Sequence, residues 1–265
     1  MRKKSLVLCC VSCVFGAFGA FFRWLQDMTA FETDSGLYIS GNLWGRAVVA
    51  ACIGVAAVLF FMVLAMKRKE KLAAPADYAA ALGGKTLLYR PAYILLAAVM
   101  AIGSLMLLFS ASRDTYPGFQ VILALMGVLS AAGFALMASA TYGRREPPLN
   151  CLGATLIIAM YCFWLIMSYR ENAVNPAVWG YAMEVLALSC ALVAFYYIAS
   201  IPFGRPKPFH AIFFSHLAAF LCIVTLPDDR WAGQQIMLIA TAGMLLFFSW
   251  MLISNMVPET EEPPA

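Results

Sequence analysis

Residues 46–66 read RAVVAACIGVAAVLFFMVLAM, and this stretch decides the fold class. Its only charged residue stands at the first position, and its length matches the roughly 20 apolar residues that a helix needs to cross a bilayer. The basic run Lys67-Arg68-Lys69 follows directly. Because basic residues that flank a membrane span tend to stay in the cytoplasm, this run predicts the orientation of the span as well.

The composition of the whole chain extends this pattern. Of 265 residues, 63% are hydrophobic and 12% are charged, whereas a soluble globular chain is usually about 45–50% apolar and about 25% charged. This composition excludes a water-soluble enzyme, a disordered chain and a nucleic-acid-binding protein. We expect an all-α, polytopic transmembrane helical bundle in the cell (plasma) membrane, with the lipid bilayer as its first partner.

Apolar runs bounded by charge, proline or glycine predict eight spans in one transmembrane domain, residues 1–255. The spans are expected at about 5–25, 46–66, 91–112, 118–141, 149–169, 180–201, 209–226 and 232–255. The acidic, proline-containing tail 256–265 is expected to be disordered. An alternative interpretation makes the first span a cleaved signal peptide, because a basic start precedes it and Ala17-Phe18-Gly19 resembles a cleavage site.

Loop charges alternate along the chain as eight spans require. Thirteen basic residues lie at the amino terminus and in the even-numbered loops, against five in the odd-numbered loops. Both termini are therefore expected to be cytoplasmic. The five basic residues on the expected outer side are Arg23, Arg46, Arg113, Arg170 and Arg230.

Short matches suggest a four-plus-four parallel repeat, an arrangement that transporters often use. Trp-Gly opens the second and sixth spans at Trp44 and Trp179, and a basic residue followed by proline opens the third and seventh. Both sequences are also ordinary at span starts, so the absence of a repeat remains an alternative. The long loop 67–90 predicts a short helix on the membrane surface, between Asp77 and a glycine pair.

Ionisable residues inside spans are costly in a bilayer and are functional candidates by default. Arg23 and Glu184 each belong to a stripe of small residues on one helix face, which predicts close helix packing. Both lie near the outer boundary, so we expect a pair between them, either a structural ion pair or a ligand-binding site. Trp24 and Trp179 stand at the same boundary, either as part of an interfacial aromatic belt or as the lining of that site.

The third candidate, His216, falls near the middle of the span 209–226. One interpretation is a core histidine that is hydrogen-bonded to a neighbour such as Tyr196 or Tyr197. The other is a protonatable residue on a pathway through the membrane. The common phosphate-binding, zinc-hydrolase and serine-hydrolase signatures are missing from the sequence. We therefore assign no catalytic residue, metal or cofactor, and an enzyme is the least favoured class.

Three stretches carry a resemblance: Phe22-Arg23-Trp24-Leu25, residues 31–37 (FETDSGL) and residues 181–188 (YAMEVLAL). They resemble uncharacterised bacterial multi-span, eight-helix membrane proteins, a family with no assigned activity. The resemblance implies a bacterial cell membrane and adds nothing about mechanism.

The leading functional expectation is a small-molecule carrier or ligand-binding membrane protein with a polar site in the outer leaflet. The alternative is a non-transporting membrane subunit or assembly factor, whose partner would be another membrane protein or further copies of this chain. The sparse polarity of the spans favours the alternative, since most carriers bury more polar groups.

Overall fold

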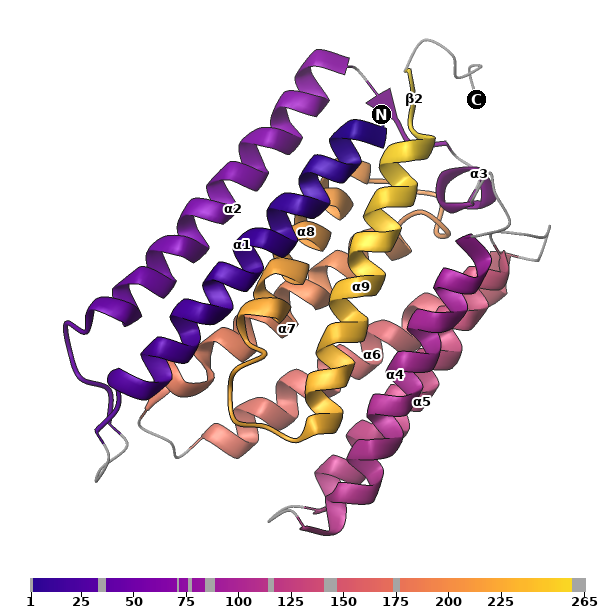
Figure 1. Ribbon diagram of the computed structural model, residues 1–265. Coiled ribbons are helices and arrows are strands. Elements are labelled where there is room, and N and C mark those ends of the chain that lie inside the picture. The colour runs from indigo at the N-terminus through magenta and orange to yellow at the C-terminus, as the bar shows by residue number, and fades with distance from the viewer. Residues whose placement is uncertain are drawn as a thin grey trace.

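A computed structural model describes residues 2–32, 37–70, 72–75, 78–83, 89–113, 117–140, 147–173 and 177–258. Within these ranges the chain forms eight helices of 17 residues or more (Figure 1). They are α1 (Arg2–Thr29), α2 (Leu43–Glu70), α4 (Tyr89–Ser110), α5 (Pro117–Ala140), α6 (Pro147–Asn172), α7 (Val178–Ala199), α8 (Pro208–Val224) and α9 (Ala232–Asn255). The short elements are β1 (Leu72–Ala73), α3 (Tyr78–Leu82), the 3-10 turn η1 (Ala111–Arg113) and β2 (Val257–Pro258).

Each predicted span coincides with one of the eight long helices, and no helix end departs from its predicted position by more than about four residues. Seven of the helices are long and apolar enough to cross a membrane, while α8 is shorter. The chain is therefore an all-helical bundle with the helix lengths and composition of a multi-pass membrane protein. Residues 259–265 of the expected disordered tail lie outside the described residues.

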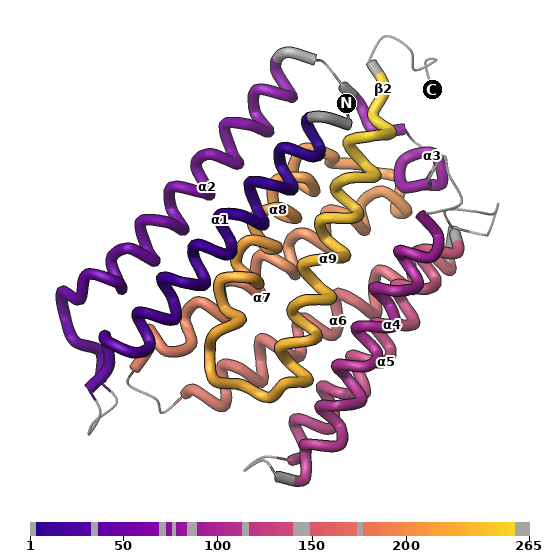
Figure 2. Tube along the Cα trace, in the orientation of Figure 1, coloured from indigo at the N-terminus to yellow at the C-terminus, as the bar shows by residue number. Residues whose placement is uncertain are grey.

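The long helices run alternately up and down, so that both ends of the chain lie at the same end of the bundle (Figure 2). We call this the terminal end; it holds the start of α1 and the end of α9. The opposite, far end holds the end of α1, the start of α7 and the loop between α8 and α9. The far end is the one that the loop charges predict to face outward.

Six of the helices, α4 to α9, close into a ring in which each packs on its chain neighbours and α9 packs back on α4. Helix α1 lies outside this ring against α8 and α9, and α2 lies on α1 and α8 (Figure 1). A four-plus-four repeat would make α2 and α4 equivalent to the closely packed α7 and α8. Instead, α2 and α4 lie on opposite sides of the bundle, so the helix neighbours give the expected repeat no support.

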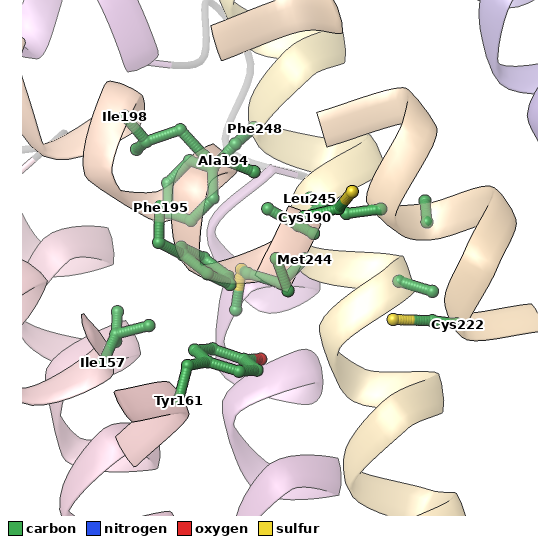
Figure 3. Close-up of a cluster of buried hydrophobic side chains, with 14 of the residues drawn as sticks. Ile157, Tyr161, Cys190, Ala194, Phe195, Ile198, Cys222, Met244, Leu245 and Phe248 are labelled. Atoms are coloured by element: carbon green, nitrogen blue, oxygen red, sulfur yellow. The ribbon is translucent and has the colours of Figure 1, made fainter. Parts of the chain in front are cut away.

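Aromatic and sulfur-containing side chains fill the inside of the ring (Figure 3). The ring of Tyr161 on α6 stacks on Phe195 of α7, with centroids 5.3 Å apart. Its hydroxyl shares a hydrogen bond of 2.5 Å with Thr241 on α9. The centre of the ring is therefore a packed core in which Tyr161 and Thr241 satisfy each other's hydroxyl groups.

Glycines set the closest helix approaches, as small residues do in membrane bundles. A Cβ built on Gly233 of α9 would lie 2.6 Å from the backbone nitrogen of Leu107 and 2.7 Å from the carbonyl oxygen of Gly103, both on α4. A similar backbone-to-backbone approach joins Gly133 of α5 to Gly153 of α6. Neither approach leaves room for a side chain.

Helix α3 is the short helix expected in this loop, and it packs against the bundle. Tyr78, Ala81 and Leu82 are buried, and the Tyr78 hydroxyl donates to the carbonyl of Met137 on α5 at 3.3 Å. The side-chain amide of Asn255 donates to the carbonyls of Ala81 and Gly83, at 3.1 and 2.8 Å. The sequence of α3, YAAAL, has no charged face that lipid headgroups could bind, and the helix packs into the terminal end of the bundle. The residue expected to cap it, Asp77, lies outside the described residues.

Burial of Tyr78 also raises the pKa of its phenol, because the charged form would lose its hydration. The hydroxyl therefore remains a hydrogen-bond donor at any physiological pH. This bond joins the long connection after α2 to α5, while the bonds of Asn255 and the antiparallel pairing of β1 with β2 join it to the end of α9 and the residues that follow.

Candidate functional site

Arg23, the last residue of the small stripe on α1, is 1% exposed and uses its whole guanidinium group. Its Nε donates to Asp228 Oδ1 at 2.7 Å. Nη1 donates to Gln26 Oε1 and to the carbonyl of Trp179, both at 3.0 Å, and Nη2 donates to the carbonyl of Gly180 at 2.8 Å. Arg23 thereby joins α1 to the first turn of α7 and to the loop between α8 and α9.

Asp228 lies between two guanidinium groups. Oδ1 accepts from Arg23, and Oδ2 accepts from Arg230 Nη2 at 2.8 Å. The loop that carries both residues is held in place from α9, because the side-chain amide of Gln235 reaches the carbonyls of Leu226 and Asp228. Asp228 is therefore a buried carboxylate with both of its oxygens in charge-assisted hydrogen bonds, the stronger kind.

The side chain of Arg230 is 6% exposed, but fewer of its donors are bound than those of Arg23. Its Nη1 lies 3.8 Å from Glu184 Oε1, too far for a hydrogen bond, and this oxygen accepts from the indole nitrogen of Trp164 at 3.1 Å. Among the described residues, Nε and Nη1 of Arg230 find no acceptor although both atoms are buried. A buried donor without an acceptor costs about 1–3 kcal/mol, and more when the group is charged.

These contacts correct the expected direct pair between Arg23 and Glu184. In the described part of the chain the two side chains are connected only through Asp228 and Arg230, in the order Arg23–Asp228–Arg230–Glu184. The physical reason is the fold of the loop between α8 and α9, which places its charges between α1 and α7. We refer to Arg23, Asp27, Asp228, Arg230 and Glu184 as the far-end charge network.

Three carboxylates and two guanidinium groups make up this network, which leaves one carboxylate in excess when all five are ionised. Asp27 is the most accessible member: its side chain is 32% exposed and lies 3.6 Å from Arg23 Nη2. The sequence interpretation treated Asp228 and Arg230 as loop charges. Their short loop, TLPDDRW, offered the one available signal, since it packs three charges between two apolar runs.

The tryptophan that contacts the network is not one of the two, Trp24 and Trp179, that were expected to line the site. Trp24 is 44% exposed and its ring lies beside Phe21. Trp179 contributes its backbone carbonyl to Arg23, while its ring, on a side chain 39% exposed, packs on Tyr38 at 5.7 Å. Trp164 is fully buried and is the tryptophan whose indole reaches the network.

His216 lies in a second polar cluster, between three helices. Its Nδ1 is 3.0 Å from the Ser12 hydroxyl on α1, and its Nε2 is 2.9 Å from the Ser249 hydroxyl on α9. The expected partners were wrong: Tyr197 stacks instead on His210 and Phe214. A neutral imidazole has one donor and one acceptor nitrogen, so two hydroxyls satisfy it completely. This geometry fits the interpretation of a satisfied core histidine.

Replacing His216 by leucine is expected to lower the free energy of unfolding by about 1–2 kcal/mol, because two net hydrogen bonds of about 1 kcal/mol each disappear. The loss stays small because both serines can turn to carbonyls of their own helices. Thermal unfolding of the purified protein in detergent measures it, with His210→Leu on the exposed side of α8 as the matched control. Equal stability of the two variants would contradict the structural role of the imidazole.

Metal and disulfide chemistry find no support in the described part of the chain. All eight cysteines are free, and no group of three or more His, Cys, Asp and Glu side chains is placed to hold a metal ion. Comparisons of the chain with protein-family models, curated proteins and solved structures find no match. The resemblance to uncharacterised bacterial eight-helix proteins therefore stays a prediction, and the function rests on the site alone.

Proposed function

We propose that the protein is a ligand-binding membrane protein, a carrier of small molecules, whose ligand binds in the far-end charge network. The observation that supports this is Arg230, whose buried side chain has two guanidinium nitrogens, Nε and Nη1, without a hydrogen-bond acceptor among the described residues. An acceptor group of a ligand would satisfy these donors and recover the free energy that their burial costs.

The assignment of roles follows from the contacts. Arg23 has its donors occupied by protein groups, so it is a structural residue. Arg230 keeps donors for a ligand, and Glu184 borders the same place at 3.8 Å. The half-exposed rings of Trp24 and Trp179 pack on Phe21 and Tyr38 and are left out of the proposed site, while Trp164, which donates to Glu184, is added to it. His216 belongs to a separate cluster and is also left out.

The proposed orientation puts the far end outside, with eight spans and both termini in the cytoplasm of a bacterial cell. Helices α7 and α9 both run from the far end to the terminal end, so α8 must bring the chain back across. Its 17 residues span about 26 Å at 1.5 Å per residue, close to the roughly 30 Å of a hydrocarbon core. The excess of basic residues in the loops at the terminal end favours a cytoplasmic position for that end.

Reporter fusions are expected to alternate between outside and inside along the chain, because successive connections between the long helices lie at opposite ends of the bundle. Activity of a periplasmic and a cytoplasmic reporter at each position measures this. Two neighbouring fusions that report the same side would contradict eight spans. Suitable positions are Asp34, Pro75, Asp114, Pro147, Asn175, Arg205 and Asp229, together with the carboxyl terminus.

A screen of solutes against the melting temperature in detergent tests the binding function. The panel holds acetate, propionate, benzoate, glycine, glucose and a methylammonium salt, each compared at equal ionic strength. At least one solute should stabilise wild type, since a ligand that binds only the folded state raises its stability. Arg230→Gln should lose that shift and the matched variant Arg205→Gln, an exposed arginine at the terminal end, should keep it. Shifts that are equal in both variants would argue against the site.

A second candidate function is the non-transporting membrane subunit. The observation that favours it is an almost entirely apolar groove of about 430 Å³ between the two peripheral helices α1 and α2. Its lining residues are Val11, Phe15, Phe18, Gly19, Phe22, Ala51, Gly54, Val55 and Val58. A second copy of the chain would fill it with a helix; native mass spectrometry in mild detergent should then show a dimer that Gly54→Phe converts to monomer. A monomeric wild type removes this support.

A further inference from the structure

We propose that the ligand at Arg230 is a small monoanion of the carboxylate type, and that it binds together with a proton taken up by Glu184. This inference rests on the proposed function, because it assigns the ligand class of the same site. It extends that function from a binding site to a proton-linked one.

The first step is the chemistry of the free groups. The unpartnered side-chain atoms of the network are N–H donors of a guanidinium group, so the ligand must present acceptors. Carboxylates are the acceptors that match a guanidinium group best in charge and geometry. A cation or a purely donating ligand would meet Arg230 with the wrong charge.

The second step is the charge balance. The far-end charge network already has one carboxylate more than it has guanidinium groups. A monoanion would add a second excess negative charge inside a largely buried site, where uncompensated charge is strongly unfavourable. One proton taken up with each anion keeps the net charge of the site constant. The bound pair is then electrically neutral.

The third step is the choice of the protonated group. Asp228 accepts charge-assisted hydrogen bonds from two guanidinium nitrogens, at 2.7 and 2.8 Å, and protonation would break at least one of them. Asp27 is 32% exposed, so water stabilises its charged form, whereas the side chain of Glu184 is only 16% exposed. Glu184 has only a neutral indole donor at 3.1 Å and an arginine nitrogen at 3.8 Å. Of the three carboxylates, Glu184 is therefore the one that loses least by taking a proton.

Protonation of Glu184 also prepares the place of the anion. A neutral carboxyl no longer attracts Arg230 Nη1, so that nitrogen becomes available to an incoming carboxylate. The charged groups that face Glu184 are Arg230 and Asp228 from the loop after α8, and Arg23 and Asp27 from α1 beyond them.

Helix α6 presents the neutral Trp164 to Glu184. The charged residues at the end of α6 face α5 instead. Arg170 lies 4.5 Å over the ring of Phe119, and Glu171 accepts from the side-chain amide of Gln120. The proton comes from the solvent and no covalent bond to the ligand changes.

Acetate binding to the full-length protein in detergent, measured by titration calorimetry between pH 6 and pH 8, tests the proposal. Acetate remains ionised throughout this range, so a change in affinity reports the protein. With one proton bound per anion, the dissociation constant should rise about tenfold per pH unit, or about 100-fold over the range. Heats measured in two buffers of different ionisation enthalpy should show the uptake of about one proton per acetate.

Two variants make the test specific. Glu184→Gln imitates the protonated carboxyl, so it should bind acetate at least as tightly as wild type does at pH 6, with no dependence on pH. Arg230→Gln should not bind acetate, and the matched control Arg205→Gln should behave as wild type. Retained folding of each variant is checked by its melting temperature in the absence of solute.

The outcomes separate the inference from the proposed function. Acetate binding that depends on Arg230 but has the same affinity at pH 6 and pH 8 overturns the proton on Glu184 and keeps the binding function. Stabilisation through Arg230 by glucose or methylammonium, with none by any carboxylate, overturns the ligand class. If no solute acts through Arg230, the site and the inference both fail.

Discussion

Arg23→Gln is expected to lower the free energy of unfolding by about 3–5 kcal/mol, the cost of breaking a buried ion pair from one side. Arg23 is 1% exposed, and its loss leaves Asp228 with one guanidinium partner instead of two. It also strips the carbonyls of Trp179 and Gly180 of their donors. Thermal or denaturant unfolding in detergent measures the loss. Arg46→Gln is the matched control, because Arg46 is an exposed arginine on α2 at the same, far end of the bundle.

A double-mutant cycle with Asp228→Asn identifies the partner. Residues in one ion-pair network couple by about 0.5–3 kcal/mol, and we expect the Arg23–Asp228 cycle to fall in the upper part of that range. The corresponding cycle of Arg23 with Glu184→Gln should show weaker coupling, because two residues stand between them. A stronger coupling to Glu184 than to Asp228 would contradict the contacts of Arg23.

Gly233→Ala should lower the free energy of unfolding by about 1–3 kcal/mol or more, the cost of overpacking a tight contact. The added Cβ meets backbone atoms of Leu107 and Gly103 at 2.6 and 2.7 Å, and backbone cannot rotate out of the way as a side chain can. Helices α4 and α9 would have to separate, which opens the ring of six helices.

Gly54→Ala on α2 is the matched control, since nothing lies within 4 Å of the Cβ it would gain. Alanine has a higher helix propensity than glycine, so the control should be as stable as wild type or slightly more stable. Gly103→Ala, on the other side of the same contact, should destabilise as Gly233→Ala does. Equal melting temperatures of all three variants would contradict the close approach of α4 and α9.

The sequence predicted the helices well because their signals are local. An apolar run of fixed length between charged, proline or glycine residues determines each helix without reference to the rest of the chain. The packed face of α1 was also predictable, since Ser5, Ser12, Gly16 and Gly19 recur at helical spacing and all four are buried. Such patterns state which face is covered, but not by which helix.

The partners of the polar residues could not be predicted, because they depend on how distant segments meet. Arg23 and Asp228 lie 205 positions apart, and Ser12 and His216 lie 204 apart. Judged only by its predicted depth in the membrane, Glu184 was a suitable partner for Arg23. The loop between α8 and α9, which places Asp228 and Arg230 between the two, is too short for its sequence to predict its conformation. The burial of α3 was missed for the same reason, since its covering groups come from α5 and α9.

The distance in sequence between Arg23 and Asp228 has a consequence for biosynthesis. A ribosome that adds about 5–20 residues per second makes Asp228 roughly 10–40 s after Arg23. Helix α8, whose Ile223 and Val224 cover the small residues of α1, emerges in the same late interval. The first hairpin of the chain is therefore inserted well before Asp228 exists. Until then the side-chain partners of Arg23 come from its own helix, Gln26 and Asp27, together with water at the membrane interface, and a nascent chain arrested before residue 228 never gains the ion pair with Asp228.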